Sequence, residues 1–205
     1  MDVKSNQSPL IKINAVLADE VCAHFDLAKE SRALLRDDMR PREFVEALLK
    51  NKQYLVGIDF LAYALPVREA IWWGCLCLQH VGGNGPSGAE RAANTATVYW
   101  VFRPTENNRV AAKSPARTAG PGTPAGALAL AVTQTRETAA KCGQPFKWLD
   151  PDAPAKTVAN AIKLASERAR VGIADTQRSF VELGVGVAEA RYEWPEIGSE
   201  IPSLR

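Results

Sequence analysis

Cysteine and histidine are the side chains of this chain that could bind a metal ion or act as nucleophiles. Cys75, Cys77 and His80 fall within one apolar segment, and Cys22 closely precedes His24. Side chains two residues apart on a helix point about 200° apart, so Cys75 and Cys77 cannot easily join one tetrahedral zinc site. Neither histidine lies in a recognisable nucleophile motif. We therefore predict buried, unreactive thiols, no metal site, no cofactor and no catalytic residue.

The glycine-rich segment 82–88 leads into a helical pattern, and free N–H groups at a helix start can bind phosphate. A P-loop also needs a lysine after the glycines and a strand before them. Here Ala89 and Glu90 follow, and a helical pattern precedes. The segment is therefore predicted to be a flexible connector and a hinge within the domain.

Arg109, Lys113 and Arg117 recur at four-residue spacing, so a continuous helix would align them in one basic stripe. The pair Ser114-Pro115 predicts a kink or stop in this helix. A solvated helix face is the commoner explanation of such a stripe, and a site for an acidic partner is the alternative. Acidic residues of the C-terminal region could dock on it, in this chain or in another copy; they are Glu189, Glu193, Glu196 and Glu200.

Aromatic side chains outside the regular helical patterns are the predicted anchors for a protein partner. Phe146 and Trp148 lie in an irregular loop, and Tyr192 and Trp194 lie near the C-terminus. Aromatic residues dominate the energetics of many protein interfaces. A loop tryptophan can equally pack back into its own fold, and the sequence leaves both alternatives open.

The elements that would position these residues are helices, because few segments alternate with a period of two. The expected helices are 15–24, 27–36, 41–51, 54–65, 66–80, 89–103, one that starts at 104–106 and is disturbed at 114–115, 124–141 and 155–177. Trp72 and Trp73 point about 100° apart, so the helix that carries both must be surrounded by others. We predict an all-α fold of stacked antiparallel helical hairpins, either repeat-like or an irregular bundle. Residues 1–14 would form an N-terminal extension, 15–180 the domain with its hinge at 82–88, and 181–205 an irregular tail.

Composition narrows the function classes. The chain has 205 residues, 46% of them hydrophobic, which is enough to bury a core. Its net charge of +2 gives no general electrostatic basis for nucleic-acid binding. Four scattered cysteines are too few for a disulfide framework, and no signal peptide or membrane-length apolar run is present. We expect a cytoplasmic protein that does not insert into membranes and binds a protein partner, with a homo-oligomer left open.

Three segments resemble an uncharacterised family of bacterial helical proteins. They are 60–75, which contains the run Leu-Pro-x-Arg-Glu-Ala-x-Trp-Trp, and the shorter 106–112 and 122–126. The resemblance extends over residues 15–170. We associate that family with contractile injection machinery of the type VI secretion kind. The resemblance implies an accessory, adaptor or chaperone-like role beside a larger assembly, and it supplies no catalytic residues.

We therefore expect a non-enzymatic adaptor that presents a surface to a protein partner. Two other classes stay open. One is an enzyme whose catalytic residues are dispersed along the chain, and the other is a regulatory module that senses a small ligand beneath Trp72 or Trp73. An exposed apolar patch would favour the adaptor, whereas a cleft with converging acids or bases would favour the enzyme.

Overall fold

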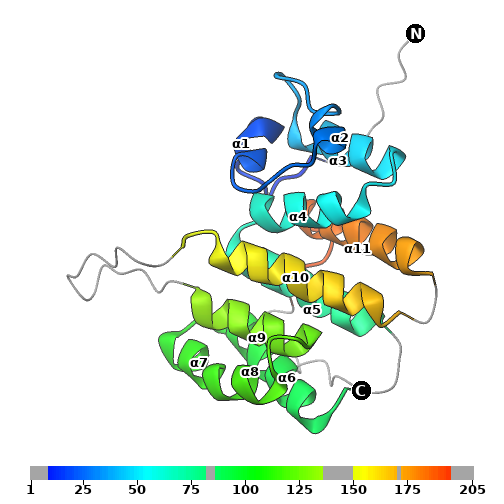
Figure 1. The fold of residues 1–205 in the computed structure, drawn as a ribbon. Helices are drawn as coiled ribbons and strands as arrows, with labels where there is room; N and C mark the ends of the chain where they lie inside the picture. Colours follow the sequence, from blue (N-terminus) through cyan, green and yellow to red (C-terminus); the bar gives the residue numbers. More distant parts are fainter. Residues whose placement is uncertain (1–8, 82–85, 136–149, 170–171, 195–205) are drawn as a thin grey trace.

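The computed structural model describes residues 9–81, 86–135, 150–169 and 172–194, and every regular element within these ranges is a helix (Figure 1). The prediction of an all-α fold is confirmed. The helices are α1 (Ala18–Cys22), α2 (Lys29–Arg32), α3 (Pro41–Lys50), α4 (Tyr54–Ala64), α5 (Val67–His80), α6 (Gly88–Phe102), α7 (Glu106–Ala111), α8 (Lys113–Ala119), α9 (Pro124–Gln134), α10 (Ala153–Glu167) and α11 (Ile173–Ala188). Within the described ranges, none of them combines the length and apolarity that crossing a bilayer requires.

Local sequence signals explain where several helices begin. Pro41 is the first residue of α3, where its missing N–H group costs nothing. Pro66 forces the preceding residue into an extended conformation and so separates α4 from α5. At the start of α6, the Ser87 hydroxyl accepts a hydrogen bond from the Glu90 N–H group, and the Glu90 carboxylate accepts one from the Ser87 N–H group.

The helices form an irregular bundle and not a repeat array. Figure 1 shows α4, α10 and α9 lying one below another, with α1 to α3 at one end and α6 to α8 at the other. Helix α4 packs against both α10 and α11, which come about a hundred residues later in the sequence. In a repeat array each unit contacts only its sequence neighbours, so these long-range contacts favour the bundle alternative.

The core has a large aromatic part and a small alanine part. Trp73, Phe44, Phe60 and Phe180 are among the largest fully buried side chains of the main cluster. A second cluster joins α6, α8 and α9 through short side chains, which let these helices approach closely; its members are Ala93, Ala116, Ala125 and Ala129. Helices α6 and α8 therefore pack on α9 through short side chains, while α6 also contributes to the main cluster.

The predicted helix 155–177 and the predicted tail from residue 181 are both wrong in their bounds. Helix α10 ends at Glu167, and α11 begins at Ile173 and continues to Ala188. Glycine disfavours helix interiors, which is why the glycine pair near residue 185 suggested a tail. Packing overrides this preference. Helix α11 passes so close to the Trp73 ring that a Cβ atom at Gly184 would lie only 2.8 Å from it, so this position needs a residue without a side chain.

Two further expectations change in detail. The predicted break at Ser114-Pro115 falls instead at Ala112, and Pro115 lies within the first turn of α8, where proline is tolerated. The last part of the N-terminal extension is packed on the bundle, since the Lys12 N–H group donates to Ala188 O at 2.9 Å.

Helices α5 and α6, which flank the predicted hinge at 82–88, contact each other and share the main core. Residues 82–85 lie outside the described ranges, and the hinge stays a prediction.

Candidate protein-binding groove

The paired tryptophans of α5 both use their indole N–H groups inside the fold. Trp73 is fully buried, and its Nε1 donates to Phe180 O at 2.8 Å. Trp72 is only 6% exposed, and its Nε1 donates to Tyr192 O at 2.9 Å. Buried indoles need such acceptors, so the pair fixes α11 and the segment after it onto α5. The close approach of Gly184 to Trp73 leaves no room for a small ligand between α5 and α11 at this point.

Arg68, in the same motif, joins the first turn of α5 to the end of α6. Its Nε donates to Val101 O at 2.7 Å, and its guanidinium carbon lies 4.1 Å from the centre of the Trp194 ring. A longer contact of 3.4 Å links its Nη2 to Phe102 O. Burial lowers the pKa of Arg68, and the nearby Glu69 carboxylate opposes this effect. Arg68 thus binds carbonyl groups that the end of α6 leaves without helical partners, which is a positioning role.

The predicted aromatic anchors are divided by the structure. Trp194 is partly buried, and it packs against the main core under Arg68. Tyr192 is 40% exposed, and its ring covers Gly186 on α11. Phe146 and Trp148 lie outside the described residues. Whether any of these side chains contacts a partner stays a prediction.

The described thiols lie in surroundings that disfavour the reactive thiolate. Burial raises the pKa of Cys75 to about 12 and that of Cys77 well above its usual value. Burial also raises the pKa of Cys22 to about 11, although Arg32 nearby acts in the opposite direction. Since the thiolate is the nucleophile and the metal ligand, these three side chains fit structural roles. Within the described ranges, no three histidine, cysteine or acidic side chains are grouped so that they could hold a metal ion.

The predicted basic stripe is interrupted between its first and second members. Arg109 on α7 is bound to the Glu106 carboxylate, with 2.6 Å between its Nε and the nearer oxygen, and its Nη1 donates to Thr133 O at 2.7 Å. Lys113 and Arg117 lie beyond the break at Ala112, on α8, and both are exposed. Arg109 therefore ties α7 to α9, and only the other two cations face solvent.

The acidic residues expected to dock on that stripe have partners elsewhere, as far as the structure describes them. Glu189 accepts hydrogen bonds from Arg42 and Arg191. Burial raises the pKa of Glu189, but these two arginines outweigh it, and the net shift is downward. Glu193 lies 3.8 Å from Lys12 Nζ. Docking of these two residues on the stripe of the same chain is thus wrong; Glu196 and Glu200 lie outside the described residues.

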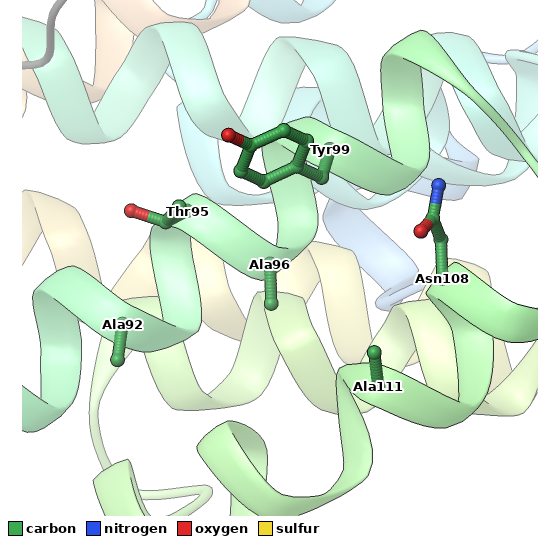
Figure 2. A pocket seen from close by; sticks show the side chains of 6 residues that line it. All are labelled: Ala92, Thr95, Ala96, Tyr99, Asn108 and Ala111. Carbon is green, nitrogen blue, oxygen red and sulfur yellow. The ribbon is translucent and has the colours of Figure 1, made fainter.

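A hollow of about 340 Å³ lies between α6 and α7, and we call it the α6–α7 groove (Figure 2). Its lining consists of Ala92, Thr95, Ala96 and Tyr99 from α6 together with Asn108 and Ala111 from α7. The four α6 residues follow the spacing of one helix face. At its far end, Asn108 Nδ2 donates to Arg103 O at 2.8 Å and so holds the start of α7 against the end of α6.

The chemistry of the groove lining is that of contact and not of catalysis. Three of its six lining residues are alanines, whose methyl groups are apolar, while the hydroxyl groups of Thr95 and Tyr99 and the amide of Asn108 offer hydrogen bonds. No carboxylate, imidazole, thiol or amine is among these lining side chains. The lining side chains therefore offer apolar and hydrogen-bonding contacts, and they do not form an acid–base pair.

Sequence reasoning missed this groove. The pattern Ala92, Thr95, Ala96, Tyr99 has the same spacing as a buried helical stripe, and short side chains of this kind are common in cores. The opposite face of α6, with Trp100 and its apolar neighbours, is the one that packs inward. A signal was present, because one face of this segment carries only small residues and a single tyrosine.

Comparison with known proteins gives a family and no activity. A model described as a family of unknown function (DUF6931) matches residues 44–188, from within α3 to the last residue of α11. No curated protein and no solved structure matches the chain. The matched part contains the tryptophan pair, Arg68 and the α6–α7 groove, whereas α1, α2 and the segment 189–194 lie outside it.

Proposed function

We propose that this chain, which belongs to the family of unknown function DUF6931, is a non-enzymatic accessory protein that binds a protein partner through the α6–α7 groove. The observation that carries the proposal is the composition of the groove. Its lining combines apolar alanine methyl groups with neutral hydrogen-bonding groups, and it has no acid–base pair. Such a surface has the means to recognise a partner and lacks the means to transform one.

The openness of the groove favours a protein segment over an enclosed small molecule. Tyr99 is 49% exposed although it lines the hollow, and Ala92 and Thr95 are also exposed. Small-molecule pockets generally bury most of the ligand surface, which this geometry does not allow. Tyrosine is enriched at protein interfaces because it combines a large apolar ring with a hydroxyl group. Because the alanine side chains of the lining are short, a partner backbone could approach the groove closely.

The biological setting of this function rests on the resemblance of the tryptophan motif. It supports an accessory role in the bacterial cytoplasm, beside a larger assembly of the type VI secretion kind. In that setting the partner would be a component of the assembly, and the protein would act by binding alone.

Affinity purification of the tagged full chain from its native host tests the proposal. A groove variant, Ala92→Gln with Tyr99→Ala, places a longer neutral side chain in the hollow and removes the exposed ring. The matched control is Leu55→Ala, which removes an exposed apolar side chain, 46% exposed, from α4. A third variant, Phe146→Ala with Trp148→Ala, tests the loop anchors.

Each result has a distinct meaning. Loss of one stoichiometric partner with the groove variant, but not with Leu55→Ala, supports the proposal. Loss with the loop variant alone would move the interface to residues 146–148 and overturn the groove assignment. Recovery of no partner by a well-folded wild-type chain would count against the adaptor function itself.

A further inference from the structure

The positive charge of this protein is concentrated in the sequence segment that contains the groove residues. Between residues 86 and 119 the chain has five cationic and two acidic residues, although its total net charge is only +2. The rest of the chain is therefore slightly acidic. The cationic residues of this segment are Arg91, Arg103, Arg109, Lys113 and Arg117.

Both acidic residues of the segment already have cationic partners. The Glu90 carboxylate accepts from Arg168 and from the Ser87 N–H group. Burial raises the pKa of Glu90, but these bonds outweigh it and the net shift is downward. The pKa of Glu106 is lowered chiefly by its hydrogen bonds with Arg109. Both carboxylates are thus hydrogen-bonded to an arginine, and Lys113 adds a smaller contribution to the lowered pKa of Glu106.

Four of the cations are exposed, and within the described residues none of them has a carboxylate within ion-pair distance; they are Arg91, Arg103, Lys113 and Arg117. Arg91 directly precedes the groove residue Ala92. Arg103 follows α6 directly, and its carbonyl group accepts from the groove residue Asn108. Lys113 begins α8, two residues after the groove residue Ala111. Arg91, Arg103 and Lys113 thus adjoin groove residues in the chain or through a hydrogen bond, at separations over which exposed charges still act at moderate salt.

The shape of the groove indicates what kind of segment it fits. From Ala92 to Tyr99 the α6 side of the groove spans eight residues, which is about 10 Å or two helical turns. Two alanines one turn apart, with a tyrosine beyond them, match a short apolar stripe on a facing helix. A nucleic acid would need the cations but not the apolar alanine side chains, so cations together with apolar lining residues favour a protein segment.

We infer that the partner segment is an acidic amphipathic helix, with its apolar stripe in the α6–α7 groove and its carboxylates toward the surrounding cations. This inference rests on the proposed function and specifies the partner. Exposed charges around an apolar centre contribute more to partner choice and association rate than to affinity. The surrounding cations would therefore exclude basic segments.

Peptide titration of the full-length protein, followed by NMR of its backbone amides, tests the inference. The probe is a designed peptide of about 18 residues, since shorter isolated helices are marginal in water. It has leucines at i, i+3, i+4 and i+7 and glutamates on the flanks. A second peptide has lysines in place of the glutamates, and a third has the first composition in scrambled order. A short DNA duplex and a single-stranded oligonucleotide complete the set.

We expect the acidic peptide to bind with amide shift changes confined to residues 92–111, and its affinity to fall as salt rises from about 0.05 M to about 0.5 M. The double variant Arg103→Glu with Lys113→Glu should weaken the acidic peptide about tenfold and favour the lysine peptide. The matched control, Lys29→Glu with Lys50→Glu, makes the same change in net charge on α2 and α3 and should bind as the wild type does. Circular dichroism confirms that both variants fold.

Three results would overturn the inference. They are equal binding of the scrambled peptide, preference of the wild type for the lysine peptide, and shift changes in the groove only with an oligonucleotide. If the purified host partner is lost with the groove variant but retained by Arg103→Glu with Lys113→Glu, the acidic-helix inference fails while the proposed function stands.

Discussion

Replacement of Arg68 by alanine tests whether the tryptophan motif builds the fold or binds a partner. The variant loses the bond from Nε to Val101 O at 2.7 Å and the contact with the Trp194 ring at 4.1 Å. A hydrogen bond that involves a charged group contributes about 1.5–3 kcal/mol, and a cation–π contact at a partly exposed site about 0.5–1 kcal/mol. The bond to Phe102 O, at 3.4 Å, adds little. We therefore expect a loss of about 3 kcal/mol in the free energy of unfolding.

Urea denaturation followed by tryptophan fluorescence and circular dichroism measures this loss. For a chain of this size it corresponds to a fall in Tm of about 6–12 °C. Arg68→Lys keeps the charge but not the forked donor geometry, so its stability should lie between those of Arg68→Ala and the wild type. Arg91→Ala removes an exposed arginine from α6 and should change stability by less than about 0.5 kcal/mol.

A free energy of unfolding of Arg68→Ala within about 0.5 kcal/mol of the wild-type value would show that these contacts do not stabilise the fold. A variant that keeps full stability but loses the host partner would show that the motif is a binding surface. Loss of the partner in the affinity purification would then assign the binding surface to the start of α5 and not to the groove.

Three further predictions concern packing, backbone strain and pH. Gly184→Ala should destabilise the fold by about 1–2 kcal/mol in the same urea assay, because its Cβ atom would lie 2.8 Å from a buried indole ring. Gly57→Ala is the control. Its Cβ atom would lie 3.1 Å from a valine methyl group, and it should change the free energy of unfolding by less than about 1 kcal/mol. Ala190 has φ = 58° just after α11, a backbone conformation that glycine adopts more readily than alanine. Ala190→Gly should therefore raise the free energy of unfolding by about 0.5–1 kcal/mol, which thermal melts measure. A lower Tm would contradict this prediction. Glu90 and Glu189 have a lowered pKa in the folded state, so their contribution is complete above pH 4.5, the usual pKa of such a carboxyl group, and is lost as pH falls through the lower folded value. Replacing both by glutamine should flatten the acid limb of a plot of stability against pH, and an unchanged limb would refute the assignment.

The sequence was informative wherever a local signal decides the structure. Pro41, Pro66 and the Thr123-Pro124 pair mark helix starts, because proline suits a first turn and restricts the residue before it. The paired tryptophans correctly indicated a central helix. These effects depend on the residue itself and its nearest neighbours in the chain.

Signals that depend on distant contacts were misinterpreted. Gly184 looked like a helix breaker, but α11 needs a residue without a side chain where it crosses Trp73. Arg109 looked like part of a basic stripe, but it contacts Glu106 and Thr133 instead of solvent. A spacing argument shows which residues share a helix face, and only the tertiary structure shows what that face meets.

From the sequence, the candidate groove could not be told apart from a buried helical stripe, for a related reason. Small residues on one face of α6 are compatible with burial against another helix, as in the alanine cluster of α6, α8 and α9, and with an open surface. The path of the chain after Phe102 decides between them, because α7 folds back beside α6 and leaves the hollow between them.

The central claim is that the groove, and not the C-terminal aromatic segment, contacts the partner. Site-specific photocrosslinking in the native host tests it most directly, with a photoreactive phenylalanine analogue placed at Tyr99 or at Tyr192. The two tyrosines are similarly exposed, 49% and 40%, so accessibility alone does not separate them. We expect one discrete protein adduct from position 99 and none from position 192. An adduct from position 192 alone would contradict it.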